Sequence, residues 1–149
     1  MRAAGICALS AVTCLGLAPA LAQPAPFEAA MEDALSGAGL AAPLIRCTAL
    51  FRAVRLRAGE DSPLRATAAT READLAVTSV TIWQRDKGTE DVATAFDTIV
   101  PMVGAASDLF LARMAANREA GESVFDPALE TELAYCATLQ DEIAAQRGE

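Results

Sequence analysis

The chain contains no histidine. Imidazole is the usual base in Ser-His-Asp and Cys-His sites, and it is a ligand in most di-iron bundles, catalytic zinc sites and c-type haem attachments. Its absence argues against all of these classes, and against the haem and copper proteins built on helical bundles. A glycine-rich phosphate loop and the D-x-D-x-D-G calcium pattern are also missing from the sequence. We therefore predict no haem, no other cofactor and no metal site.

The first 22 residues have the layout of a secretory signal peptide. A basic Met1-Arg2 start precedes the apolar run 3–17, and Ala20-Leu21-Ala22 forms a small-x-small cleavage site. The apolar run is too short to span a membrane comfortably. Cys14 lacks the leucine that bacterial lipoproteins carry three positions earlier, so soluble export is favoured over a lipid anchor. We expect a signal peptide at 1–22 and one helical-bundle domain at 23–149, soluble in the periplasm or secreted.

Two of the four cysteines, Cys47 and Cys136, lie outside this leader. An oxidising compartment favours their pairing, and the bridge would close most of the exported chain into one loop. Two inert buried thiols are one alternative. A redox pair is another, but redox cysteines usually lie close together, as in C-x-x-C. We predict a structural disulfide.

The composition is acidic and strongly apolar. Asp and Glu number 20 against 12 Lys and Arg, giving a net charge of −8, while 53% of the residues are hydrophobic. An acidic chain repels the phosphates of nucleic acid and of anionic lipid. The apolar content is too high for a disordered chain. We therefore predict a folded protein with no nucleic-acid partner and no stable membrane insertion.

Hydrophobic spacing predicts an all-α fold. A short helix at 27–35 precedes four main helices at about 43–58, 63–86, 89–120 and 127–148. The segment 77–83 is β-branched, but no second strand is available to pair with it, so we predict helix there too. The prediction is a four-helix antiparallel bundle. Its first and last main helices would be neighbours, as a Cys47–Cys136 bridge requires.

Each main helix has residues spaced three and four apart that we expect to be buried. In chain order they are Leu40, Leu44, Cys47, Phe51, Val54 and Ala58; Leu64, Ala68, Leu75, Ser79 and Ile82; Val92, Phe96, Ile99, Val103, Ala106 and Phe110; and Leu129, Leu133, Cys136 and Ile143. Thr89 is expected to cap the third main helix, and Pro101 to kink or split it. Trp83 follows Ile82, so we expect it at the edge of the buried face.

Arginine is concentrated between residues 46 and 71, where only two acidic residues oppose it. The arginines of this window are Arg46, Arg52, Arg55, Arg57, Arg65 and Arg71. The segment 119–149 is acidic instead. If the disulfide brings the first and last main helices together, these charges pair within the molecule, at about 1 kcal/mol or less per surface pair. We favour this interpretation over the alternative, in which exposed arginines dock an acidic protein or ligand.

The leading functional hypothesis is a non-enzymatic exported module that binds an unidentified protein or small ligand. Arg52, Arg55, Arg57 and a rim Trp83 are the candidate contact residues. A carboxylate-only enzyme is one alternative, with neighbouring acids such as Glu130 and Glu132 as an acid–base pair. A third is an acid-stress chaperone that exposes apolar surface when its carboxylates become protonated. The chain resembles the periplasmic acid-stress chaperones in composition only, without a shared motif and with a much longer span between the cysteines.

Overall fold

The computed structural model describes residues 26–148. The predicted signal peptide at 1–22 lies outside the described residues. The elements are α1 (Phe27–Ala34), the 3₁₀ helix η1 (Gly39–Ala41), α2 (Ala42–Arg57), α3 (Pro63–Lys87), α4 (Val92–Glu119) and α5 (Pro127–Arg147). The all-helical class is confirmed, and the segment 77–83 is helical within α3. The described residues form five α-helices, of which α1 corresponds to the predicted short helix and α2 to α5 correspond to the predicted main helices.

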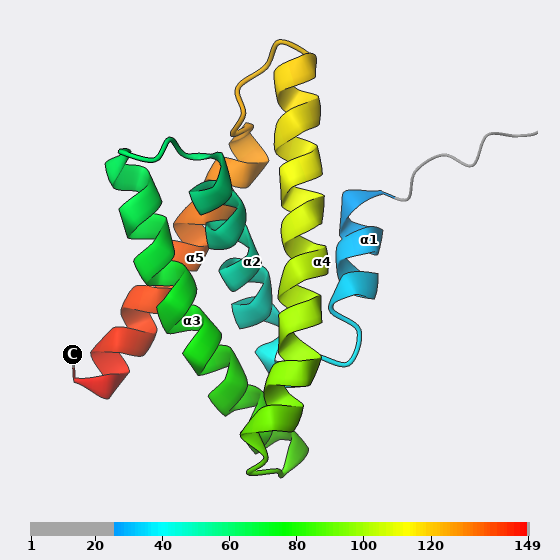
Figure 1. The fold of residues 1–149 in the computed structure, drawn as a ribbon, viewed down its shortest axis with the longest axis vertical. Coiled ribbons are helices and arrows are strands. Elements are labelled where there is room, and N and C mark those ends of the chain that lie inside the picture. Colours follow the sequence, from blue (N-terminus) through cyan, green and yellow to red (C-terminus); the bar gives the residue numbers. More distant parts are fainter. Residues whose placement is uncertain (1–25, 149) are drawn as a thin grey trace, which may run out of the picture.

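Helix α2 is the centre of the fold. Successive helices run in alternating directions, and α2 lies between α3 and α4 in this view, with α5 crossing behind (Figure 1). Because α2 packs against α3, α4 and α5, nine of its residues are buried. They are Leu44, Ile45, Cys47, Thr48, Ala49, Leu50, Phe51, Ala53 and Val54. The sequence predicted one buried face, whereas a helix with neighbours on three sides is buried nearly all round.

The predicted disulfide is confirmed. Cys47 in α2 and Cys136 in α5 are bonded, with a Cα–Cα distance of 5.4 Å, and both side chains are buried. The first and last main helices are therefore neighbours, as the cysteine positions required. Helix α5 has only one other buried residue, Leu129. The disulfide is thus a large part of what holds α5 against α2.

The start of α4 differs from the prediction. Asp91, not Thr89, is the N-cap, and its carboxylate accepts hydrogen bonds from the backbone N–H groups of Ala93 (3.0 Å) and Thr94 (3.3 Å). Thr89 lies before the helix, where its hydroxyl accepts from the backbone N–H of Asp91. A carboxylate is also favoured over a hydroxyl by the positive end of the helix dipole.

Of the predicted kink or split at Pro101, the split does not occur, because α4 is continuous through this residue (Figure 1). Pro101 is exposed. Water can therefore reach the carbonyl group that loses its intrahelical donor. By length and composition α4 is the one helix within residues 26–148 that could cross a membrane. In this fold it packs against α1, α2 and α3, with Ile99, Phe110 and Met114 in the core.

Several residues predicted to be buried are exposed. Leu40 is 72% exposed, because it belongs to η1 and not to the α-helical face of α2. Leu64, Val92 and Phe96 are each about half exposed, because they lie in the outer turns of α3 and α4. The prediction that Trp83 lies at the edge of the buried face is also wrong, because Trp83 is more buried than predicted. Its side chain is only 7% exposed, and its indole N–H has no partner within the described residues.

Asp126 fixes the turn between α4 and α5. It caps α5 and accepts hydrogen bonds from the Nε and Nη2 atoms of Arg113, both at 2.9 Å, and from Asn117 at 2.8 Å. Burial raises the pKa of this carboxyl group. Hydrogen bonds from the Leu129 backbone, Arg113 and Asn117, with the charge of Arg113, outweigh that effect and lower its pKa to about 2.

The stabilisation from ionised Asp126 is therefore present above the ordinary carboxyl pKa of about 4 and is lost as the pH falls through about 2. We expect Asp126→Asn to lower the free energy of unfolding at pH 7, with a deficit that shrinks towards pH 2. Urea unfolding at pH 7, 4 and 2 measures this. Asp97→Asn, at an exposed position of α4, is the control. If Asp126→Asn lowers the free energy of unfolding by the same amount at all three pH values, the lowered pKa of Asp126 is not the source of its contribution to stability.

Candidate functional site

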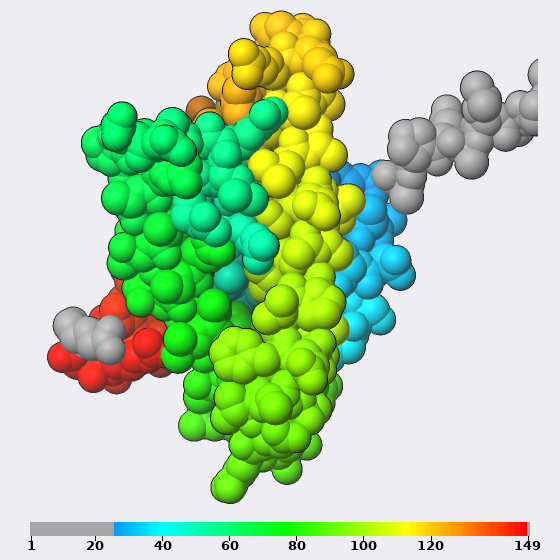
Figure 2. Space-filling view, viewed as in Figure 1, coloured from blue at the N-terminus to red at the C-terminus, as the bar shows by residue number. Residues whose placement is uncertain are grey.

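A groove opens between α3 and α4, with α2 as its floor. Its volume is about 340 Å³. The space-filling view shows atoms of α2 between α3 and α4 on this face (Figure 2). The lining residues come from all three helices and are Thr48, Arg52, Ala69, Glu72, Ala73, Ala76, Val80, Phe96, Ile99, Val100 and Val103.

The local sequence explains why the groove is open and apolar. Helix α3 presents Ala69, Ala73 and Ala76, whose spacing of four and three places them on one face. Their side chains end at Cβ and leave space between α3 and α4. Helix α4 supplies the opposite wall, including Phe96 and Val100, which are each about half exposed. These two side chains present apolar surface that no other helix covers.

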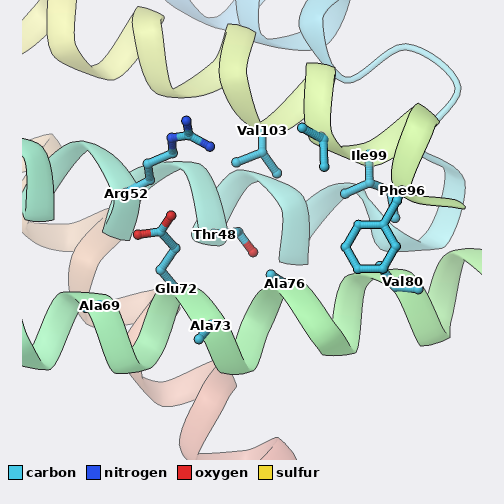
Figure 3. Close-up of a pocket in the computed structure, with 11 residues that line it drawn as sticks. Thr48, Arg52, Ala69, Glu72, Ala73, Ala76, Val80, Phe96, Ile99 and Val103 are labelled. Atoms are coloured by element: carbon cyan, nitrogen blue, oxygen red, sulfur yellow. The ribbon is translucent and has the colours of Figure 1, made fainter. Parts of the chain in front are cut away.

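The charged groups are gathered at one end of the groove. Arg52 and Glu72 lie together there, while Val80, Phe96 and Ile99 lie at the other end (Figure 3). Arg55 donates to the Glu72 carboxylate through Nε (2.5 Å) and Nη2 (3.2 Å), and this hydrogen bonding raises the pKa of Arg55. Within residues 26–148 Arg52 makes no ion pair. Arg52, Arg55 and Glu72 together therefore give this end of the groove one net positive charge.

The structure separates the four residues predicted as candidate contacts. Arg52 lines the groove, and Arg55 lies beside it, paired with Glu72. Arg57 is exposed at the end of α2 and does not line the groove. Trp83 cannot be the predicted rim anchor, because its side chain is buried in the core. Of the predicted set, only Arg52 faces the groove directly.

Other arginines of the basic window pair within the molecule. Arg46 donates to Glu28 (2.8 and 3.0 Å) and to Glu132, and so links α2 to α1 and α5. Arg71 in α3 contacts Asp141 of α5 at 3.4 Å. Together with the Arg55–Glu72 pair, these contacts provide acidic partners for three of the six arginines in the window.

A second cavity, of about 610 Å³, lies between η1, the start of α2, the end of α3 and α5. It also contains arginines, Arg85 and Arg147, and its walls include the exposed Leu40 and Tyr135. Arg147 donates to the hydroxyl of Thr78 at 2.7 Å, so part of its hydrogen-bonding capacity is used internally. Variants in this cavity can therefore serve as controls for variants in the groove.

Carboxylates are sparse around the groove. Glu72 is its only lining acid, and Arg55 holds that group. Glu132, one of the predicted acid–base candidates, is held by Arg46. Within the described residues no three Cys, Asp or Glu side chains are grouped so that they could hold a metal ion. The chain matches no family model, no curated protein and no solved structure in the comparisons made.

Proposed function

We propose that the protein is an exported, non-enzymatic binding protein and that the groove over α2 is its site. The ligand is a small apolar molecule that carries a negative charge. One observation carries the proposal: an open apolar groove ends at Arg52, which makes no ion pair within residues 26–148. The volume of about 340 Å³ falls within the range of small-molecule sites, which supports a small ligand over a protein domain.

Electrostatics supports an anionic ligand. The chain has a net charge of −8, so its surface generally repels anions. Arg52 is a local exception, placed against apolar walls, where a charge-assisted hydrogen bond is stronger than in water. Export is supported by the signal-peptide pattern and by the Cys47–Cys136 disulfide, since disulfides persist mainly in oxidising compartments.

The groove also bears on the enzymatic alternative. An enzyme that uses carboxylates alone needs at least two in its pocket, whereas the groove has only Glu72, held by Arg55. The chaperone alternative requires apolar surface to become available at low pH. Our proposal instead requires binding at neutral pH, where the groove is already open.

The proposal predicts saturable binding of an apolar anion at pH 7. Titration with 1-anilinonaphthalene-8-sulfonate, followed by dye fluorescence, should give one site per chain. Arg52→Glu is expected to weaken binding at least tenfold, about 1.4 kcal/mol, because it replaces attraction by repulsion at the groove end. Arg57→Glu makes the same charge change on the same helix, outside the groove, and should leave the affinity within about twofold.

Two results would contradict the proposal. One is the absence of saturable binding at pH 7, or binding that appears only near pH 3, as a chaperone would show. The other is a loss of affinity in Arg85→Glu equal to that in Arg52→Glu, which would move the site to the second cavity. Thermal unfolding of each variant verifies that the fold is intact.

A further inference from the structure

We infer that the ligand is a carboxylate with a single unbranched hydrocarbon chain of about ten to fourteen carbon atoms. Its carboxylate lies at Arg52, and its chain runs along the groove towards Phe96. This inference rests on the proposed function and names the ligand class of the same site. The polarity of the groove is the starting point, since charged groups occupy one end and Val80, Phe96 and Ile99 the other (Figure 3).

The middle of the groove is suited to hydrocarbon. Its one polar side chain there is Thr48, whose hydroxyl already donates to the backbone carbonyl of Leu44 at 2.8 Å. The wall on α3 consists of Ala73 and Ala76 at this level. The side chains here offer no free hydrogen-bonding group to a ligand that carries hydroxyl or amide groups, so the walls favour hydrocarbon over such a ligand. An unsubstituted alkyl chain has no polar group that needs a hydrogen-bond partner.

The length of the groove sets the length of the chain. Lining residues run from Ala69 to Val80 on α3 and from Phe96 to Val103 on α4. At 1.5 Å per residue these stretches span about 16 Å and about 10 Å. An extended alkyl chain advances about 1.25 Å per C–C bond, so these spans correspond to roughly ten to fourteen carbon atoms. The volume of about 340 Å³ admits one such chain rather than the two of a diacyl lipid.

The polar end selects the head group. A guanidinium matches the geometry of a carboxylate and of a phosphate. Arg52, Arg55 and Glu72 together carry one net positive charge, which the first negative charge of a ligand neutralises, so a second negative charge has no cation left to balance it. A monoanion is therefore favoured over the dianion of a phosphate monoester. The carboxylate is the head group that satisfies both conditions.

Calorimetric titration with sodium hexanoate, octanoate, decanoate, dodecanoate and tetradecanoate tests this inference, each below its micellar concentration and at pH 8. Affinity should rise about fourfold per methylene, the equivalent of about 0.8 kcal/mol, and level off between ten and fourteen carbons. Decan-1-ol, which lacks the charge, and decyl phosphate, which has two, should each bind at least tenfold more weakly than decanoate.

A blocking variant tests the direction of the chain. Ala76 lies seven residues from Ala69, about 10 Å along α3 from the Arg52 end. Ala76→Leu should therefore shorten the preferred chain by at least two carbons while octanoate affinity changes less than threefold. Ala66→Leu, at an exposed position of α3 outside the groove, is the matched control and should leave the preference unchanged.

These titrations distinguish the proposed binding site from the proposed ligand class. Decanol binding as tightly as decanoate would overturn the head-group assignment, and decyl phosphate binding more tightly would assign the site to a phosphate head. Affinity independent of chain length, or an unchanged preference in Ala76→Leu, would overturn the chain assignment. In each case saturable dye binding sensitive to Arg52→Glu leaves the groove as the site. Failure of both dye and carboxylates to bind would overturn the proposed function itself.

Discussion

Removing the Cys47–Cys136 disulfide is expected to lower the free energy of unfolding by about 4–5 kcal/mol. The two cysteines are 89 residues apart, so the bridge restricts most of the chain in its unfolded state. Urea unfolding of the Cys47→Ala/Cys136→Ala variant against the oxidised wild type measures the effect. Both sites are buried. Alanine therefore removes the bridge without introducing an unpaired polar group.

The structure also indicates which helix should be destabilised most when the disulfide is removed. Helix α5 contributes only Leu129 and Cys136 to the fully buried core. Hydrogen exchange of the double variant should therefore show the largest loss of protection in α5 and a smaller loss in α2. Wild type reduced under native conditions is the control and should behave like the variant. Two reactive thiols in unfolded, unreduced wild type, or a stability change under 1 kcal/mol, would contradict the role of the bridge.

Arg46→Ala is expected to destabilise the protein by about 2–4 kcal/mol. The Glu132 side chain is only 14% exposed, and Arg46 is its ion-pair partner between α2 and α5. The same guanidinium donates to Glu28 and lies 5.8 Å from the ring centroid of Phe27, so it also holds α1. Removing it leaves a mostly buried carboxylate unpaired. Urea unfolding at pH 7 measures the loss.

Two variants control for this interpretation. Arg57→Ala removes an exposed arginine of the same helix, which makes no ion pair within residues 26–148, and should change stability by less than about 0.5 kcal/mol. Arg46→Met/Glu132→Leu removes both groups of the buried pair and should recover part of the loss, because the one carboxylate left without Arg46, Glu28, is exposed to water. An Arg46→Ala variant as stable as Arg57→Ala would show that the network contributes little.

Local signals in the sequence predicted much of the fold. Spacing of three and four identified the helices, and the predicted starts at residues 63 and 127 coincide with prolines in the first turns of α3 and α5. The cysteine positions predicted that α2 and α5 are neighbours. The cap of α4 was misplaced because Thr89 and Asp91 are both good caps, and the choice depends on where the preceding turn ends.

The candidate site was predicted only in part. The arginine window pointed to Arg52, but the sequence does not reveal which arginines find partners, since Glu72 and Glu132 are distant in the chain. Phe96 has the spacing of a core residue, and its place in the groove depends on which helices pack around α2. The alanines of α3 gave a possible signal. Three small residues on one helical face indicate either close helix packing or an open groove, and only the assembled fold decides between them.

Whether the groove over α2 binds the ligand is tested most directly by mapping amide chemical-shift changes in ¹⁵N-labelled protein titrated with decanoate at pH 8. We expect saturable shifts confined to the groove, in the segments 48–52, 69–80 and 96–103. The largest should lie near Arg52 and Ala76. Shifts centred on Arg85, Tyr135 and Arg147 of the second cavity, or no saturable shifts at all, would contradict the assignment of the groove as the binding site.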